Sequence, residues 1–272
     1  MGEFLSVMGP ALVASLLLTA IFVYFGLHIV RRGVIFVDLA LAQVAAMGGT
    51  VAFLSGYPLE GQGAYFFSLA FAFFGSVVFT FARSREEVVP QEAIIGIVYA
   101  FAAAATVLLV DKAPHGAEHI KYLLVGNILW VTWSTIGVLS VVILVVALFH
   151  FFFRRNFSLV SFDSEQARRE GISVALWDLL FYLSLAWVVT TSVQTAGVLL
   201  IFSFLIVPAV CGLLLSKRLK IGLLLSWLVG AGVSLAGIAL SYSWDLPTGA
   251  AIVCTFGLAL LVIAVLKRVV VG

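Results

Sequence analysis

The sequence predicts an all-α fold, a polytopic bundle of about eight or nine transmembrane helices. Of its 272 residues, 63% are hydrophobic and only 10% are charged, and the mean hydropathy is +1.21. Soluble domains carry roughly 25% charged residues, so this chain has too few polar groups to cover a water-facing surface. The formal net charge of +2 gives no reason to expect nucleic acid as a partner.

Nine apolar runs are each close to the roughly 20 residues that a spanning helix needs. The second and the seventh run are the most liable to be broken or partly re-entrant, so eight full spans remain an alternative. The predicted spans cover residues 8–30, 34–55, 64–82, 92–110, 128–153, 172–193, 196–216, 221–242 and 247–266.

The basic residues fall into two unequal groups. Thirteen lie in alternate connections and at the C-terminus, whereas the other connections hold only Lys112 and Lys121. The positive-inside rule places the larger group in the cytoplasm, so the N-terminus is expected outside and the C-terminus inside. Asp178 is expected to pair with a cation at the cytoplasmic interface. The larger group is Arg31, Arg32, Arg83, Arg85, Arg154, Arg155, Arg168, Arg169, Lys217, Arg218, Lys220, Lys267 and Arg268.

Residues 1–272 are expected to form a single transmembrane domain. The longest polar connection covers only about residues 154–171, which leaves no room for a soluble domain. The nucleotide-binding pattern GxxxxGK[ST] does not occur in the sequence. We therefore expect no enzyme activity in this chain, and any ATP that drives transport must be hydrolysed by a separate chain.

A short amphipathic helix is predicted at about residues 162–171, in the connection on the cytoplasmic side. Asp163 or Ser164 can cap its first turn, and Gly171 can end it. The segment is either an ordinary solvated connector or a docking helix that carries motion from a partner into the membrane.

The connection at 111–121, on the opposite side, contains the string HxxEH. In metalloproteases such a string lies on a helix within a catalytic domain, but here it stands in a short loop, so a protease is excluded. Imidazole and carboxylate groups suit zinc, iron and manganese. The loop is therefore either a solvated segment or a metal-catching mouth formed by His115, Glu118 and His119.

Several segments together resemble one family, the permease subunits of the bacterial ABC importers for zinc, manganese or iron (metal-type ABC-3 permeases). The motif of the predicted docking helix is carried by Phe162, Asp163, Ala167 and Gly171. A glycine-leucine-leucine run that ends in valine-proline-alanine follows it, as Gly197, Leu199, Leu200, Val207, Pro208 and Ala209. The resemblance covers nearly the whole chain in order, including residues 31–32, 92–97, 122–129 and 246–249.

The resemblance implies a fold like that of type II ABC importer permeases, in a bacterial cytoplasmic membrane and surrounded by its lipid. It also implies a second permease copy, an extracytoplasmic solute-binding protein and a cytoplasmic ATP-binding subunit. The ATP-binding subunit, which holds the ATP, would dock on Phe162, Asp163, Ala167 and Gly171. No covalently bound cofactor is implied, and the divalent metal ion is the cargo.

The second span departs from the family's pattern. Members carry an aspartate and a histidine four residues apart there, and the matching positions in this chain are Leu39 and Gln43. Asp38 stands one residue early, rotated about 100° around the helix. An intramembrane carboxylate is by default a candidate for function. Asp38 is therefore either a pathway residue, with Gln43 as a helper, or an ion-pair partner of the neighbouring arginines.

Two other functions remain open. A pathway without hard ligands would suit a metal chelate or another small solute. A secondary transporter would work without an ATP-binding partner, but it predicts several intramembrane acids and no docking helix.

Overall fold

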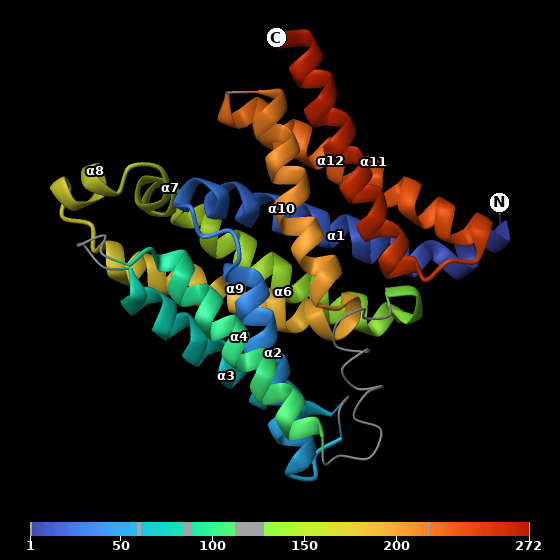
Figure 1. Ribbon diagram of the computed structural model, residues 1–272, viewed down its shortest axis with the longest axis horizontal. Coiled ribbons are helices and arrows are strands. Elements are labelled where there is room, and N and C mark those ends of the chain that lie inside the picture. The colour runs from blue at the N-terminus through green and yellow to red at the C-terminus, as the bar shows by residue number, and fades with distance from the viewer. Residues whose placement is uncertain (1, 59–60, 84–88, 112–127, 217, 272) are drawn as a thin grey trace.

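The computed structural model describes residues 2–58, 61–83, 89–111, 128–216 and 218–271, and every regular element in these ranges is a helix (Figure 1). Nine of the described helices are long and apolar enough to cross a membrane, which confirms the higher of the two expected numbers. The elements are α1 (Gly2–Arg32), α2 (Val37–Leu54), α3 (Gln62–Ala82), α4 (Gln91–Val110), η1 (Ile128–Trp130), α6 (Trp133–Phe152), α7 (Arg154–Phe162), α8 (Ser164–Arg169), α9 (Val174–Ala196), α10 (Val198–Leu215), α11 (Leu219–Trp244) and α12 (Thr248–Val271).

The second and seventh predicted spans are the shortest of the nine, with 18 residues each in α2 and α10. Eighteen residues give about 27 Å of helix, close to the roughly 30 Å of the bilayer core. Both helices are continuous, and α10 passes through Pro208 without a break. Neither helix is broken or re-entrant, so the alternative of only eight full spans is not supported.

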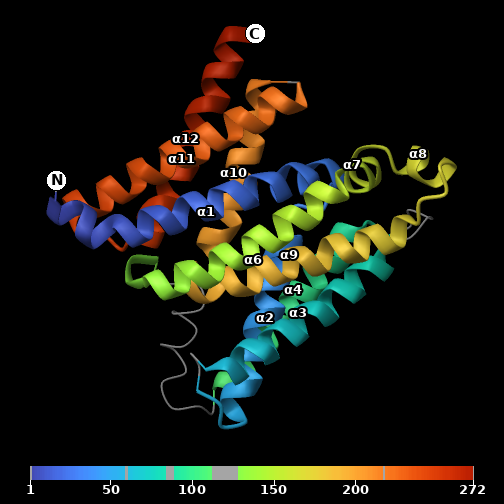
Figure 2. The same ribbon diagram turned by 180° about the vertical axis from the view of Figure 1, so that it is seen from behind.

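The long helices form three groups. Figures 1 and 2 show α2, α3 and α4 together at one end of the molecule and α11 with α12 at the other. Between them run α1, α6 and α9, and α10 crosses these steeply and packs on α1, α11 and α12. The chain turns sharply from α9 into α10 at Gly197, whose φ of +80° is readily adopted only by glycine.

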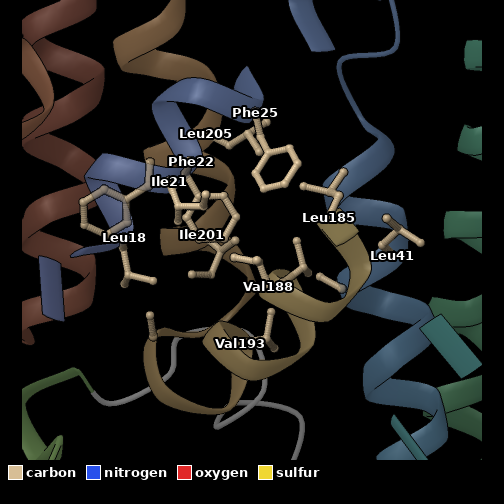
Figure 3. Close-up of a cluster of buried hydrophobic side chains, with 14 of the residues drawn as sticks. Leu18, Ile21, Phe22, Phe25, Leu41, Leu185, Val188, Val193, Ile201 and Leu205 are labelled. Atoms are coloured by element: carbon tan, nitrogen blue, oxygen red, sulfur yellow. The ribbon is translucent and has the colours of Figure 1, made fainter. Parts of the chain in front are cut away.

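The core lies where α1, α9 and α10 meet (Figure 3). In a bilayer, close van der Waals packing rather than exclusion of water holds such helices together. The buried side chains in the centre of this cluster come mainly from these three helices, with one from α2. They are Leu18, Ile21, Phe22, Phe25, Leu41, Leu185, Val188, Val193, Ile201 and Leu205.

The helices α1 and α10 touch at Gly26. A Cβ there would overlap the carbonyl oxygen of Leu205 and lie 3.0 Å from the Cβ of Ala209. We expect Gly26→Ala to lower the free energy of unfolding by about 1–3 kcal/mol, because the two backbones must move apart. Gly137→Ala on α6 is the control, since a Cβ there meets nothing within 4 Å. Thermal unfolding in detergent measures both, and equal midpoints would contradict this contact.

Candidate functional site

Asp38 lies in the first turn of α2 and is buried, with only 1% of its surface exposed. Neither carboxylate oxygen has a hydrogen-bond partner in the part of the chain that the structure describes. The alternative of an ion pair with the neighbouring arginines is wrong for Arg32, whose guanidinium instead binds Asp178. No described cation lies within ion-pair distance of Asp38, so no side chain in the described ranges compensates its buried charge.

One face of α2 runs from Asp38 towards the other end of the helix. At 100° per residue, Asp38, Ala45 and Gly49 lie within about 40° of one another around the axis. Leu39 and Gln43 are rotated from Asp38 by about 100° and 140°. Leu39 packs against the hydrophobic core and Gln43 is buried. The two positions that match the family's metal pair therefore lie off the face that carries the carboxylate.

A second carboxylate stands near the beginning of α2. Glu92, in the first turn of α4, accepts a hydrogen bond from the backbone N–H of Phe36 at 3.0 Å. Its other oxygen, Oε2, is buried without a hydrogen-bond partner among the described residues. A negative charge is favourable at the N-terminal end of a helix, so Glu92 holds the start of α2 against α4.

A cavity of about 920 Å³ lies between the opposite half of α2 and the neighbouring helices. It is lined by α2 at Ala45 and Gly49, by the beginning of α3 and α6, and by the end of α9. The distribution of basic residues predicts that these ends lie on the outer side, so we name it the outer cavity. None of its described lining residues is charged or a histidine or cysteine. Its polar groups are hydroxyls and amides, including Tyr65, Thr190 and Thr191.

At the other end of the helices, Asp178 bridges two arginines. Its Oδ1 accepts from Arg32 Nη1 at 2.6 Å and its Oδ2 from Arg83 Nη1 at 2.5 Å. The side chains of Arg32 and Asp178 are only 2% and 1% exposed, whereas that of Arg83 is 25% exposed. This cluster, named here the Asp178 clamp, ties α9 to α1 and α3, and it confirms the expected pairing of Asp178.

The Asp178 clamp extends to α7 through Ser161. Arg32 Nε donates to Ser161 Oγ at 2.9 Å, and Ser161 Oγ lies 2.8 Å from His28 Nδ1. The arginine can only donate, so the Ser161 oxygen accepts from Arg32 while it also shares a hydrogen bond with His28. His150 is likewise held, between Tyr24 and Ser184 at 3.0 and 2.8 Å. Both histidines therefore serve the packing of this end.

The short helix predicted at residues 162–171 is present but covers fewer residues, and a second helix precedes it. Phe162 ends α7, and α8 covers only Ser164–Arg169. Asp163 caps α8, as predicted, by accepting from the backbone N–H of Gln166 at 2.9 Å. Gly171, with φ +76°, follows the helix as its stop. We call α7 and α8 together the elbow.

The elbow has a buried anchor and an open groove. Ala167 is fully buried, while Phe162 is 38% exposed and lies against His28 with ring centroids 5.2 Å apart. A groove of about 360 Å³ runs between the two helices, and its lining includes Ser158, Phe162 and Asp163. The segment thus presents a shaped surface at the end where the Asp178 clamp lies.

The predicted external metal site cannot be compared with the structure, because His115, Glu118 and His119 lie outside the described residues. Within the described ranges, no group of three or more His, Cys, Asp or Glu side chains is arranged to hold a metal ion.

The sequence reasoning missed the outer cavity and the role of Arg83. One feature of the sequence could have indicated the cavity, namely the run Thr190, Thr191, Ser192. Three successive hydroxyl residues are unusual within an apolar helix. Arg83 was counted only as a cytoplasmic charge. Its contact with Asp178 spans 95 residues and could not be foreseen from spacing.

Comparison with known proteins gives one consistent result. Residues 5–267 match the model of the ABC 3 transport family. The chain is 28% identical over 256 residues to the manganese import system permease protein ScaB of Streptococcus gordonii, covering 93% of this chain and 88% of that protein. It is 29% identical over 246 residues to a protein of Haemophilus influenzae named "Probable iron transport system membrane protein", covering 90% of this chain and 88% of that protein.

The fold matches a solved structure over almost its whole length. PsaBC from Streptococcus pneumoniae, solved in complex with Fab, superposes with a TM-score of 0.79 at 24% sequence identity. The match covers 96% of this chain and 94% of that one.

Proposed function

Because the chain belongs to the ABC 3 transport family, we propose that it is the membrane-spanning permease subunit of an ATP-driven importer of divalent metal ions. Manganese and iron are the cargoes named for its relatives, and zinc belongs to the same range. The permease lies in the cytoplasmic membrane of a bacterium, with its N-terminus outside and its C-terminus in the cytoplasm. ATP is bound and hydrolysed on a separate subunit, so this chain itself is not an enzyme.

The observation that carries the proposed cargo is the buried, unpartnered carboxylate of Asp38. A charge at this depth is costly unless it is compensated, and no described side chain compensates it. Carboxylate oxygens suit manganese and iron in the 2+ state. A cation passing along this face of α2 would compensate the negative charge of Asp38. Glu92 lies close to the same end of α2.

The ATP-binding subunit docks on the elbow, through the groove next to Phe162 and Asp163. The elbow is joined to the spanning helices by the hydrogen bond from Arg32 to Ser161 and by the Asp178 clamp. Movement of α7 and α8 on ATP binding would therefore be transmitted directly to α1, α3 and α9.

A second permease copy completes the pathway, and an extracytoplasmic solute-binding protein delivers the metal to the outer face. Small residues on a membrane helix allow another helix to pack closely against it. On α11, only one of the two small-residue pairs is free to contact a second copy. Gly230 faces α1 and α10 within the chain, because a Cβ there would lie 2.6 Å from Thr19 and 3.3 Å from Pro208. Ser234 is also buried within the chain. Gly232, four residues before Ala236, has nothing within 4 Å of its Cβ position.

Filling the elbow groove should uncouple the permease from its ATP-binding subunit. Ser158 lines the groove at half-buried depth, so a bulky side chain there would occupy the space that the partner needs. We expect Ser158→Trp to reduce copurification of the ATP-binding subunit at least fivefold while the permease keeps its thermal stability. Ser243→Trp is the matched control, because Ser243 is exposed and lies at the C-terminal end of α11, away from the elbow. Undiminished copurification of the Ser158 variant would contradict this docking surface.

One observation favours the runner-up cargo, a metal chelate. The outer cavity has no charged lining residue among those described, so an ion there meets only neutral oxygen atoms. A secondary transporter is not supported, since the family is one of ABC transporters and the elbow is present.

A further inference from the structure

Four cations lie where α11 begins and α12 ends. Figures 1 and 2 both show the first turn of α11 and the last turns of α12 at one end of the molecule, away from α7 and α8. The positive-inside rule predicts that this end faces the cytoplasm. We name these cations the basic patch, which consists of Arg218, Lys220, Lys267 and Arg268. All of them are exposed except Lys267, which is half-buried.

The cations of the basic patch have no acidic partner. None of them forms an ion pair with a side chain in the ranges that the structure describes. The three helices that pack on one another here, α10, α11 and α12, contain no aspartate or glutamate. By contrast, four arginines in the other predicted cytoplasmic segments are paired with acids of the chain. These pairs are Arg32 and Arg83 with Asp178, Arg155 with Glu170 and Arg169 with Glu165.

On α12, a stripe of exposed apolar side chains leads to the basic patch. This helix is the least buried of the nine candidate spans in the described ranges. At 100° per residue, the members of the stripe lie within about 100° of one another around the helix axis. They are Leu258, Leu261, Val262 and Val265. Arg268 is rotated from Leu261 by only about 20°, so the arginine stands at the end of this stripe.

The same arrangement recurs on α11. Lys220 lies in its first turn, and Leu224 and Leu228 follow at intervals of four residues, 55% and 62% exposed. Positions at this interval turn by about 40° around the axis, so the three side chains share one face. Long cationic side chains keep their stems on apolar surface while their charged ends reach the polar layer. Both helices therefore combine an exposed apolar stripe with a cation at its end.

A phospholipid with a net negative charge fits both features. Its headgroup supplies the anion that the basic patch lacks, and each cation close to a membrane surface strengthens binding of anionic lipid about fivefold. Its acyl chains cover the apolar stripes. Leu258 lies about 15 Å along α12 from Arg268, which is half of the roughly 30 Å hydrocarbon core and therefore the depth of one leaflet.

We propose that the basic patch binds the headgroup of an anionic phospholipid, whose acyl chains lie along the exposed faces of α11 and α12. The lipid ties the end of α12 to the beginning of α11. A second copy of this chain fits the patch poorly, because a two-fold contact here would bring the same cations of both copies together. This inference goes beyond the proposed function and does not depend on the cargo.

The test offers the purified full-length chain equal amounts of phosphatidylglycerol and phosphatidylcholine with identical acyl chains. Native mass spectrometry counts the bound lipids, and we expect the anionic one to predominate. Lys220→Gln combined with Arg268→Gln should lower this preference at least about fivefold, the effect of one cation near an anionic surface. The unfolding midpoint without lipid should not change, since both side chains are exposed and unpaired in the described ranges. Lys220→Arg combined with Arg268→Lys should keep the preference, because both charges remain.

Arg155→Gln combined with Arg169→Gln is the matched control. It also removes two exposed arginines, but these are paired with Glu170 and Glu165, so the preference for phosphatidylglycerol should stay. Equal binding of the two lipids by the unmodified chain, or an equal loss of preference in the control, would overturn the proposal. Glycerol phosphate, the headgroup without acyl chains, separates the lipid from a free phosphate. Displacement of the lipid by an equal concentration of it would also contradict the proposal, because the apolar stripes would then contribute nothing.

Discussion

Asp38→Asn is expected to lower metal-dependent transport by at least about tenfold while leaving the chain as stable as before, or more stable. The side chain keeps its shape but loses its charge, and an ionised carboxylate without a partner is costly to bury. The amide offers a passing cation only a neutral oxygen. Opposite changes in activity and stability distinguish a pathway residue from a structural one, for which both would fall together.

The measurement is initial-rate manganese uptake together with thermal unfolding of the same preparations. Asp245→Asn is the control, because this exposed aspartate lies in the turn after α11 with φ +51°, a conformation that asparagine also accepts. Full transport by the Asp38 variant would rule out a role of this carboxylate in the pathway.

Asp178→Ala is expected to be the most destabilising of the changes considered, by about 3–5 kcal/mol. The substitution leaves the guanidinium of Arg32, with 2% of its side chain exposed, buried without its carboxylate. It also releases Arg83, so α9 loses its ion pairs with α1 and with the end of α3 at once. Because the clamp stands between the elbow and these helices, ATP hydrolysis should no longer respond to metal in whatever folded protein remains.

Glu170→Gln is the matched comparison. It removes an ion pair with Arg155 of similar length, 2.7 Å, but the two side chains are 29% and 74% exposed. Exposed pairs contribute roughly 0–1 kcal/mol, so little change in the unfolding midpoint is expected. Equal losses of stability in the two variants would show that the Asp178 clamp does not hold this end of the bundle.

Much of the fold follows from the sequence because the bilayer imposes one strong rule, about 20 apolar residues for each helix. The nine spans and the Asp163 cap could be predicted on that basis and from local capping chemistry. The helix α7 could not, because Arg154–Phe162 is too short and too mixed in polarity to differ from a connector. Its position depends on Phe157, which stacks on His150 at 3.9 Å and is fully buried.

The candidate site was less accessible to sequence reasoning. Asp38 could be singled out because an intramembrane acid is rare, but its lack of a partner depends on Arg32 binding Asp178, 146 residues away. The outer cavity is built from ordinary serines, threonines and a tyrosine on α3, α6 and α9. Only the packing of those helices brings the hydroxyls together, so the spacing of residues within one segment does not predict the cavity.

ATP-driven manganese uptake into proteoliposomes tests the central claim most directly. The vesicles contain this chain with or without its ATP-binding subunit, and the solute-binding protein is supplied outside. The account predicts uptake only when both subunits and ATP are present, and its loss when the elbow groove is filled by Ser158→Trp. Uptake that proceeds without the ATP-binding subunit, or an ATP-binding subunit that never associates with this chain, would contradict it.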